Sequence, residues 1–490
     1  MRYLILAGLL AMASGVYSQI VFDEYFNDQT LRIDYFHTGN STVEEIITDK
    51  MYVQGTWAGS KAGCIQPFEL GTYKVLVRDS ETFNIIYTKG YNSIFAEYQT
   101  IGDAIKGIKR TFHESVLIPL PKRRFILEIE KRDRQNSLYG IFKQEIDPLD
   151  YHIIREKPGS QHDVVISTVK SGDPHNKVDI VILGEGYQEN EADKFKIDLE
   201  NYTKIFFTVE PYKSRRNQFN IHGVFSPSVE SGTDEPRQQI YKNTRLSSSF
   251  NYFDLDRYCL VDDNKSIRDV ASKVPYDVIV IMVNRERYGG GGIYNCQSVF
   301  TARAPNSNYV LLHEFGHGFA GLADEYFSSS ITYVDFYTEG TEPLEANVTA
   351  QTERDKIKWK QFLSPGIQIP TDWGKARYDS LLDIRNHIML EGEKKLSALR
   401  KSSASEARLM EAREEISRQV VSLNREIHDF YEKHPLKDKV GLFEGANYMS
   451  KGLYRPTLMS LMNGIQDELS YLIVNEHAIL EVMNYYTGEK

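Results

Sequence analysis

Hydrophobic and polar residues alternate through the first third of the chain. Residues 73–78, 83–88, 114–119 and 124–130 each switch between apolar and polar side chains, and Gly, Asn, Asp and Pro separate them. Alternation with a period of two predicts strands that bury one face. Several short strands at this spacing predict an antiparallel β-sandwich, which we place at residues 19–155. No pattern in this region suggests catalysis, so a supporting domain is expected.

A different pattern begins after a linker near residues 157–162. Residues 178–184 form a continuous apolar run, which is typical of a strand buried on both faces of a sheet. A segment with helical periodicity follows at 190–209. Two further apolar runs, at 219–225 and 277–283, predict two more strands. This alternation of strands and helices predicts a second domain of α+β class.

The next segments complete the predicted sheet. Residues 288–294, with glycine at 289–292, predict a loop that could move over a cleft. Residues 297–301 predict a short strand at the edge of the sheet, where an extended peptide could pair with it. A helix is expected from about Ser307. The order of elements predicts a twisted mixed sheet with helices packed on it, in a catalytic domain at residues 160–490.

A charged helical segment is inserted in this second domain, at about residues 376–434. Apolar residues recur there three, four and seven positions apart, which places them on one face of a long helix. They are Leu409, Ile416, Val420, Leu423 and Ile427. We predict a helical hairpin with a solvated outer face, and a closing helix at 467–486.

The first residues of the chain resemble an export signal. Met1-Arg2 precedes an apolar run at 4–16, and small residues follow near Ser18. This order predicts a signal peptide at residues 1–18, cleaved after Ser18, and therefore a secreted, periplasmic or cell-surface protein. No other stretch approaches the roughly 20 apolar residues of a membrane span.

Composition and cysteine content narrow the class of protein further. Hydrophobic residues make up 41% and charged residues 26% of the chain, as in soluble globular proteins. A net charge of −10 argues against a nucleic-acid-binding protein, because phosphate binding needs a basic face.

In an exported protein Cys259 could pair with Cys296, which would leave Cys64 unpaired. The alternative is three separate buried thiols.

The chemistry of the chain centres on an HExxH motif, His313-Glu314-Phe-Gly-His317. On a helix, side chains four residues apart project from the same face, so both imidazoles can bind one metal ion. Glu314 is then placed to act as a general base on water at the metal. The motif therefore predicts a catalytic zinc site. The alternative is that both are ordinary core histidines on a buried helix and bind no metal.

A third ligand is expected shortly downstream. Gly318 and Gly321 are expected to end the helix, and Asp324 follows seven residues after His317. Two histidines and one aspartate would leave the fourth position open, as in catalytic zinc sites. Glu325 is the alternative ligand, since it also offers carboxylate oxygens. It could instead support a ligand histidine through a hydrogen bond.

The segment from His313 to Tyr326 resembles the signature of the bacterial IgA-peptidase family of zinc metallopeptidases, which are relatives of the metzincins. Residues 181–187, 230–234 and 452–456 add to this resemblance. It covers about residues 165–485 and implies a zincin- or metzincin-like catalytic domain.

The resemblance also implies roles for the motif residues. His313, His317 and Asp324 would bind zinc, and Glu314 would be the general base. The chain departs from the metzincin spacing, because Ala320 stands at the usual glycine position. Gly321 and Asp324 each come one residue later than the glycine and the third ligand of the metzincin pattern. The path of the chain from the helix to the metal is therefore expected to differ from that of the metzincins.

Metzincin-like enzymes place a methionine in a turn beneath the zinc, and the chain offers Met459 and Met462. Met462 is preferred because it precedes Asn463-Gly464, a strong turn signal. Both could instead be ordinary core residues. Tyr326 and Tyr454 could donate phenolic hydroxyls to an oxyanion, although a structural role is the simpler interpretation.

The sequence therefore predicts a secreted zinc endopeptidase that acts on a protein or peptide, and the family name suggests a host glycoprotein such as immunoglobulin. One alternative is a surface binding protein that keeps a degenerate metal site. The intact Glu314 argues against it, since a purely structural site needs no base. Another alternative is a zinc amidase that acts on a non-protein cell-wall substrate.

Overall fold

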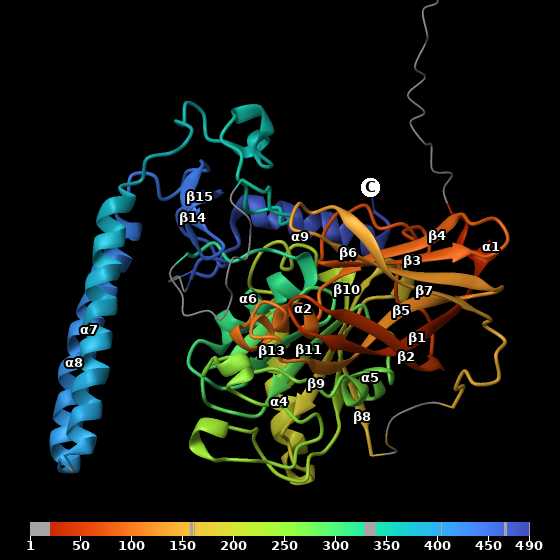
Figure 1. Cartoon of the computed structure of the whole chain (residues 1–490), viewed down its shortest axis with the longest axis horizontal. Helices are drawn as coiled ribbons and strands as arrows, with labels where there is room; N and C mark the ends of the chain where they lie inside the picture. Colours follow the sequence, from red (N-terminus) through yellow and green to blue (C-terminus); the bar gives the residue numbers. More distant parts are fainter. Residues whose placement is uncertain are drawn as a thin grey trace, which may run out of the picture.

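The computed structural model describes residues 20–156, 160, 162–327, 340–402, 404–464 and 468–489. The predicted signal peptide lies outside these residues, as does most of the predicted linker. Figure 1 shows the whole chain, coloured from the N-terminus to the C-terminus.

The N-terminal part of the chain forms two antiparallel sheets. One has the strand order β2-β1-β5 and the other β4-β3-β6-β7. The strands are β1 (Phe26–Gly39), β2 (Glu44–Val53), β3 (Tyr73–Asp79), β4 (Ile85–Tyr91), β5 (Arg110–Pro121), β6 (Phe125–Arg132) and β7 (Leu138–Ile146). Three short helices accompany them, α1 (Phe22–Tyr25), α2 (Ile94–Tyr98) and α3 (Gly102–Ile105).

The two sheets share one apolar core. Val75 and Val77 of β3 pack in the same buried cluster as Ile33 of β1 and Ile118 of β5. Lys74 and Arg78, which flank this pair on the same strand, stay partly exposed, while Leu76 between the two valines is buried. The alternation seen in the sequence therefore reflects a sandwich of two sheets that face each other.

The second domain contains a six-stranded mixed sheet of order β12-β13-β11-β9-β10-β8. Its central strands β10, β9, β11 and β13 run parallel, while β8 and β12 pair antiparallel to their neighbours. The strands are β8 (Val164–Lys170), β9 (Val178–Glu185), β10 (Phe219–Phe225), β11 (Val278–Val283), β12 (Gly290–Ile293) and β13 (Gln297–Thr301). The fold is thus α+β with a mixed sheet, as predicted.

Both faces of this sheet are covered, which explains the continuous apolar runs. Ile180 and Ile182 of β9 point to one face and Val181 and Leu183 to the other. The first face packs on α4 (Ala192–Phe206), α6 (Ser307–Ala320) and α9 (Leu472–Thr487). The second face packs on α5 (Asn264–Ala271) and on α2 of the sandwich domain.

Two predictions about the edge of the sheet were wrong. Residues 297–301 form β13, which lies between β12 and β11 and is therefore not an edge strand. Residues 290–293 form the edge strand β12 rather than a mobile loop. The glycines are needed because this strand lies against α6: a Cβ atom on Gly292 would stand 2.5 Å from the Glu314 carbonyl oxygen.

The predicted hairpin is present as α7 (Lys375–Lys401) and α8 (Glu406–Glu432). Figure 1 shows the two helices side by side and standing away from the two domains. An aromatic cluster that includes Trp373 and Tyr431 holds the base of the hairpin. A two-stranded sheet follows, formed by β14 (Phe443–Ala446) and β15 (Met449–Arg455).

The three cysteines are free thiols, so of the two alternatives the structure has three separate thiols and no bond between Cys259 and Cys296. Burial raises the pKa of Cys64 and of Cys296 to about 12. Each thiol therefore behaves as a small apolar side chain. In the part of the chain that the structure describes, no helix is long and apolar enough to cross a membrane.

Candidate metal centre

Helix α6 brings the two histidines of the motif to one face, and its end returns the chain toward them. The helix ends at Ala320, and Gly321 adopts a left-handed conformation with φ +59°. The Gly321 N–H donates to the His317 carbonyl oxygen over 3.0 Å, which closes the last turn. Gly318 lies inside the helix, where a Cβ atom would stand 2.1 Å from Ser298 Oγ. Of the two glycines predicted to end the helix, only Gly321 does so.

Three side chains converge beside this turn. The Nε2 atoms of His313 and His317 lie 3.1 Å apart. Asp324 Oδ1 lies 3.1 Å from the first and 3.3 Å from the second. A tetrahedron with bonds of 2.0–2.1 Å has edges of about 3.3–3.4 Å, so these separations fit three ligands of one small divalent ion. Among the described residues this is the one group of histidine, cysteine and carboxylate side chains with such convergence.

The second nitrogen of each imidazole is held by a carbonyl group. His317 Nδ1 donates to the Leu322 carbonyl oxygen over 2.6 Å. His313 Nδ1 lies 3.1 Å from both the Leu461 carbonyl oxygen and the Tyr309 hydroxyl. Because a carbonyl only accepts, a proton sits on Nδ1, and in the neutral ring Nε2 then keeps a lone pair. The Nε2 atoms of both neutral rings can thus bind a metal ion at the point where the two rings meet.

Asp324 is buried, and the structure leaves its Oδ1 atom without a hydrogen bond from any described residue. Its other oxygen accepts a hydrogen bond from the Tyr448 hydroxyl. Burial would raise the pKa of Asp324, but the two imidazoles hold it well below its ordinary value. Those imidazoles lower the pKa only while they are protonated; once the rings are neutral, a buried carboxylate oxygen facing two lone pairs is costly unless a metal ion takes the place of the protons. The donor set therefore fits a metal ion.

Glu325, the alternative third ligand, faces away from the histidines. Its Oε1 atom accepts from the side-chain amides of Asn347 and Asn475 over 3.1 and 2.8 Å. Its Oε2 atom accepts from Ser460 Oγ over 2.7 Å. Glu325 thus ties together segments that surround the site, and Asp324 is the carboxylate that meets the imidazoles.

Glu314 lies on the same helix, beside the candidate ligands and against β12. Burial raises the pKa of Glu314, and the two histidines oppose that effect. Its side chain keeps part of its surface exposed. A carboxylate in this environment takes up a proton more readily than an ordinary glutamate does, which suits a general base.

Of the two candidate methionines, Met462 lies beneath the site. It is fully buried, and its Sδ atom would stand 2.9 Å from a Cβ atom on Gly316, between the two histidines. The Met462 carbonyl oxygen also accepts the Glu325 N–H over 2.9 Å. Met459 instead packs at the base of the hairpin.

Several residues near the site were missed in the sequence. Tyr448 holds Asp324, and Arg257 hydrogen-bonds with Tyr326 and Tyr288 close to Glu314. The Tyr326 ring stacks on His313 at 6.3 Å between centroids. Tyr448, Arg257 and Tyr288 come from segments far apart in the chain and carry no local motif, whereas Tyr326 was already a candidate from the signature segment. Tyr454, which we considered as an oxyanion donor, packs instead beside Trp359 and Ile357.

Comparison with known families agrees with this geometry. The model of the IgA peptidase M64 family matches residues 166–483, and the model of the M64 N-terminal region matches residues 21–143. The chain belongs to the IgA peptidase M64 family. No curated protein gives a significant match. As an M64 peptidase, the chain is a metal-dependent hydrolase that acts on peptide bonds.

The close contact between β12 and α6 leads to a first prediction for this M64 peptidase. Gly292→Ala should lower the free energy of unfolding by about 1–3 kcal/mol and reduce activity, because the methyl group would push β12 away from Glu314 and His317. Urea unfolding and peptidase assays measure both effects. Gly140→Ala on β7 is the matched control, since its Cβ atom would meet nothing within 4 Å. Equal stability of both variants would contradict the packing argument.

Proposed function

We propose that the protein is an exported zinc endopeptidase that uses Glu314 as its general base. The convergence of His313, His317 and Asp324 within hydrogen-bonding distance of one another carries this proposal. Two imidazoles and one carboxylate are ligands that suit zinc, and three protein ligands leave room for water and substrate. Secretion is supported by the signal-like residues 1–18.

Zinc, when bound, would polarise the scissile carbonyl and make water more acidic. The protein supplies the proton transfers. Glu314 accepts a proton from the attacking water and delivers it to the leaving amine. Its raised pKa, caused by burial, suits both steps. The Nδ1 hydrogen bonds of the two histidines keep the rings in position throughout.

Arg257, together with Tyr326 and Tyr288, is proposed to bind the negative charge that develops on the substrate carbonyl. The guanidinium group hydrogen-bonds with both tyrosines near Glu314. A prepositioned donor of this kind is worth more in the transition state than in the ground state.

The role of this arginine can be tested by mutation. Arg257→Ala should lower kcat/KM by about 10²–10³-fold, with most of the loss in kcat. Arg123→Ala removes an exposed arginine of the sandwich domain and should leave both constants unchanged. A loss confined to KM would indicate that Arg257 binds the ground state of the substrate instead.

We also propose that the substrate backbone pairs with the edge strand β12. Tyr258 already bridges to Gly290, so the part of the edge offered to a peptide lies beyond Gly290, where Gly292 packs against Glu314. A peptide added along this edge would pass over the candidate metal centre, and main-chain pairing binds extended peptides of many sequences.

The proposal as a whole is tested by metal analysis combined with cleavage of a peptide library. We expect one zinc per chain, internal cleavage of peptides, loss of activity with a chelator and its return with zinc. Immunoglobulin A and peptidoglycan are included as separate substrates. Zinc binding without cleavage of any peptide, or cleavage of peptidoglycan alone, would overturn the assignment as an endopeptidase.

A further inference from the structure

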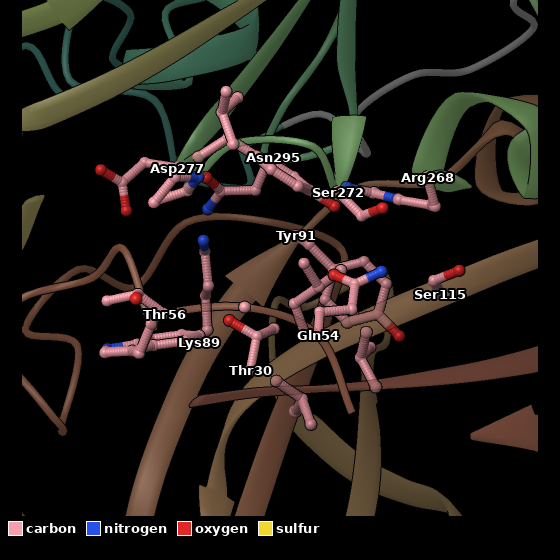
Figure 2. A pocket seen from close by; sticks show the side chains of 18 residues that line it. Thr30, Gln54, Thr56, Lys89, Tyr91, Ser115, Arg268, Ser272, Asp277 and Asn295 are labelled. Atoms are coloured by element: carbon pink, nitrogen blue, oxygen red, sulfur yellow. The ribbon is translucent and has the colours of Figure 1, made fainter. Parts of the chain in front are cut away.

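A small cavity of about 60 Å³ lies between the sandwich domain and the catalytic domain, away from the candidate metal centre. Figure 2 shows Lys89 and Gln54 extending from the sandwich domain toward Asp277 and Arg268 of the catalytic domain. Tyr276 also lines the cavity. Polar and charged side chains of both domains thus meet around one space.

Several hydrogen-bond donors around this cavity have no partner among the described residues. Gln54 Nε2 and the Tyr276 hydroxyl are buried and make no hydrogen bond. Lys89 Nζ makes no hydrogen bond or ion pair, and lies 5.6 Å from the centre of the Tyr486 ring. Arg268 is 6% exposed, and its Nε atom alone donates, to Asn264 Oδ1 over 3.3 Å. Unsatisfied donors are costly in a protein interior, so this set calls for an acceptor.

The charges around the cavity also favour an acceptor that is negative. Burial lowers the pKa of Lys89 to about 8, and Arg268 lowers it further while Asp277 opposes the shift. Burial raises the pKa of Asp277, and burial together with the charge of Asp277 raises that of its neighbour Asp179. The two carboxyl groups therefore hold a proton more readily than two separate ones would, which lowers the negative charge beside Lys89. Among the residues that line the cavity, two basic side chains, Lys89 and Arg268, face one carboxyl group, that of Asp277.

We propose that this cavity binds a small oxyanion, of the size of sulfate or acetate, which joins the two domains. Its oxygens would accept hydrogen bonds from Lys89 and Gln54 on one side and from Arg268 on the other. The volume of the cavity sets the size of the anion. One water molecule needs about 10–15 Å³ of this volume, so a cavity of about 60 Å³ has room for roughly four to six atoms of the size of a water oxygen. The site is separate from the proposed catalytic chemistry.

Isothermal titration calorimetry of the metal-loaded protein with sodium sulfate, and separately with sodium acetate, tests this proposal. We expect a saturable site that Lys89→Met weakens by about tenfold or more, since a charged donor is lost. Lys143→Met removes an exposed lysine of the same domain and should leave the affinity unchanged. Since neither variant alters the metal centre, anion binding to the metal cancels in the comparison.

Gln54→Leu offers a second variant, should Lys89→Met fail to fold. It removes one unpartnered donor and should weaken anion binding by a smaller factor. A crystal structure grown with selenate should show its anomalous signal between Lys89 and Arg268. No saturable binding by the wild type, equal affinity in all variants, or a cavity that holds only water would overturn the proposal.

Discussion

Glu314→Gln is expected to keep one metal ion per chain and to lose about 10²–10⁴-fold in kcat, the usual contribution of a general base. Glutamine has nearly the same shape, so β12 and α6 should stay in place. It cannot accept the proton of the attacking water. Metal analysis and steady-state kinetics on a cleavable peptide measure both quantities.

The control for this prediction is Glu411→Gln, which changes an exposed glutamate of the hairpin helix α8. It should leave kcat and metal content unchanged. If Glu314→Gln retained full activity, Glu314 would have no role in proton transfer. If it lost the metal, its effect on kcat could not be assigned to the base.

Asp324→Ala and Glu325→Ala should separate binding of the metal from support of the fold. Asp324→Ala removes one of three convergent donor groups, so we expect the metal to be lost on dialysis and activity with it. Glu325→Ala leaves the ligands in place but removes an acceptor of hydrogen bonds from Asn347, Asn475 and Ser460. It should lower the free energy of unfolding by about 2–4 kcal/mol.

Metal content and urea unfolding of the metal-free proteins measure these two effects separately. Asp324→Ala should change the stability of the metal-free protein much less than Glu325→Ala does, because burial of its charge is costly without a cation. A Glu325→Ala protein that is stable but free of metal would reverse the two roles.

The sequence predicted those parts of the site that depend on local geometry. His313 and His317 share a helix face because they are four residues apart, and this holds wherever the helix packs. Gly321 ends α6 because its left-handed conformation suits glycine. The patterns along β3 and β9 were also informative: alternation along β3 indicates a strand buried on one face, and the apolar run of β9 indicates a strand buried on both faces.

The choice between Asp324 and Glu325 could not be made from the sequence. Neighbouring side chains in a non-helical segment point in different directions, and both residues are carboxylates. The decision depends on what surrounds them. Asn475 and Ser460, more than a hundred residues downstream, hold Glu325, while Tyr448 holds Asp324.

The strand at the edge of the catalytic sheet could not be predicted from the sequence either. The glycine run at 289–292 looks like a loop when only neighbouring residues are considered. It becomes β12 because glycine alone fits between β13 and α6. Strand order depends on pairing between distant segments, so β13 could not be recognised as an inner strand from its own five residues.

What the sequence determined by itself is therefore the class of fold, the helix that carries the motif and the pair of imidazoles one turn apart, because these follow from periodicity over a few residues. The tertiary structure decided which carboxylate meets those imidazoles, which strand forms the open edge, and which arginine and tyrosines lie beside Glu314. These features arise from contacts between segments that are far apart in the chain, and such contacts leave no periodic signal in either segment.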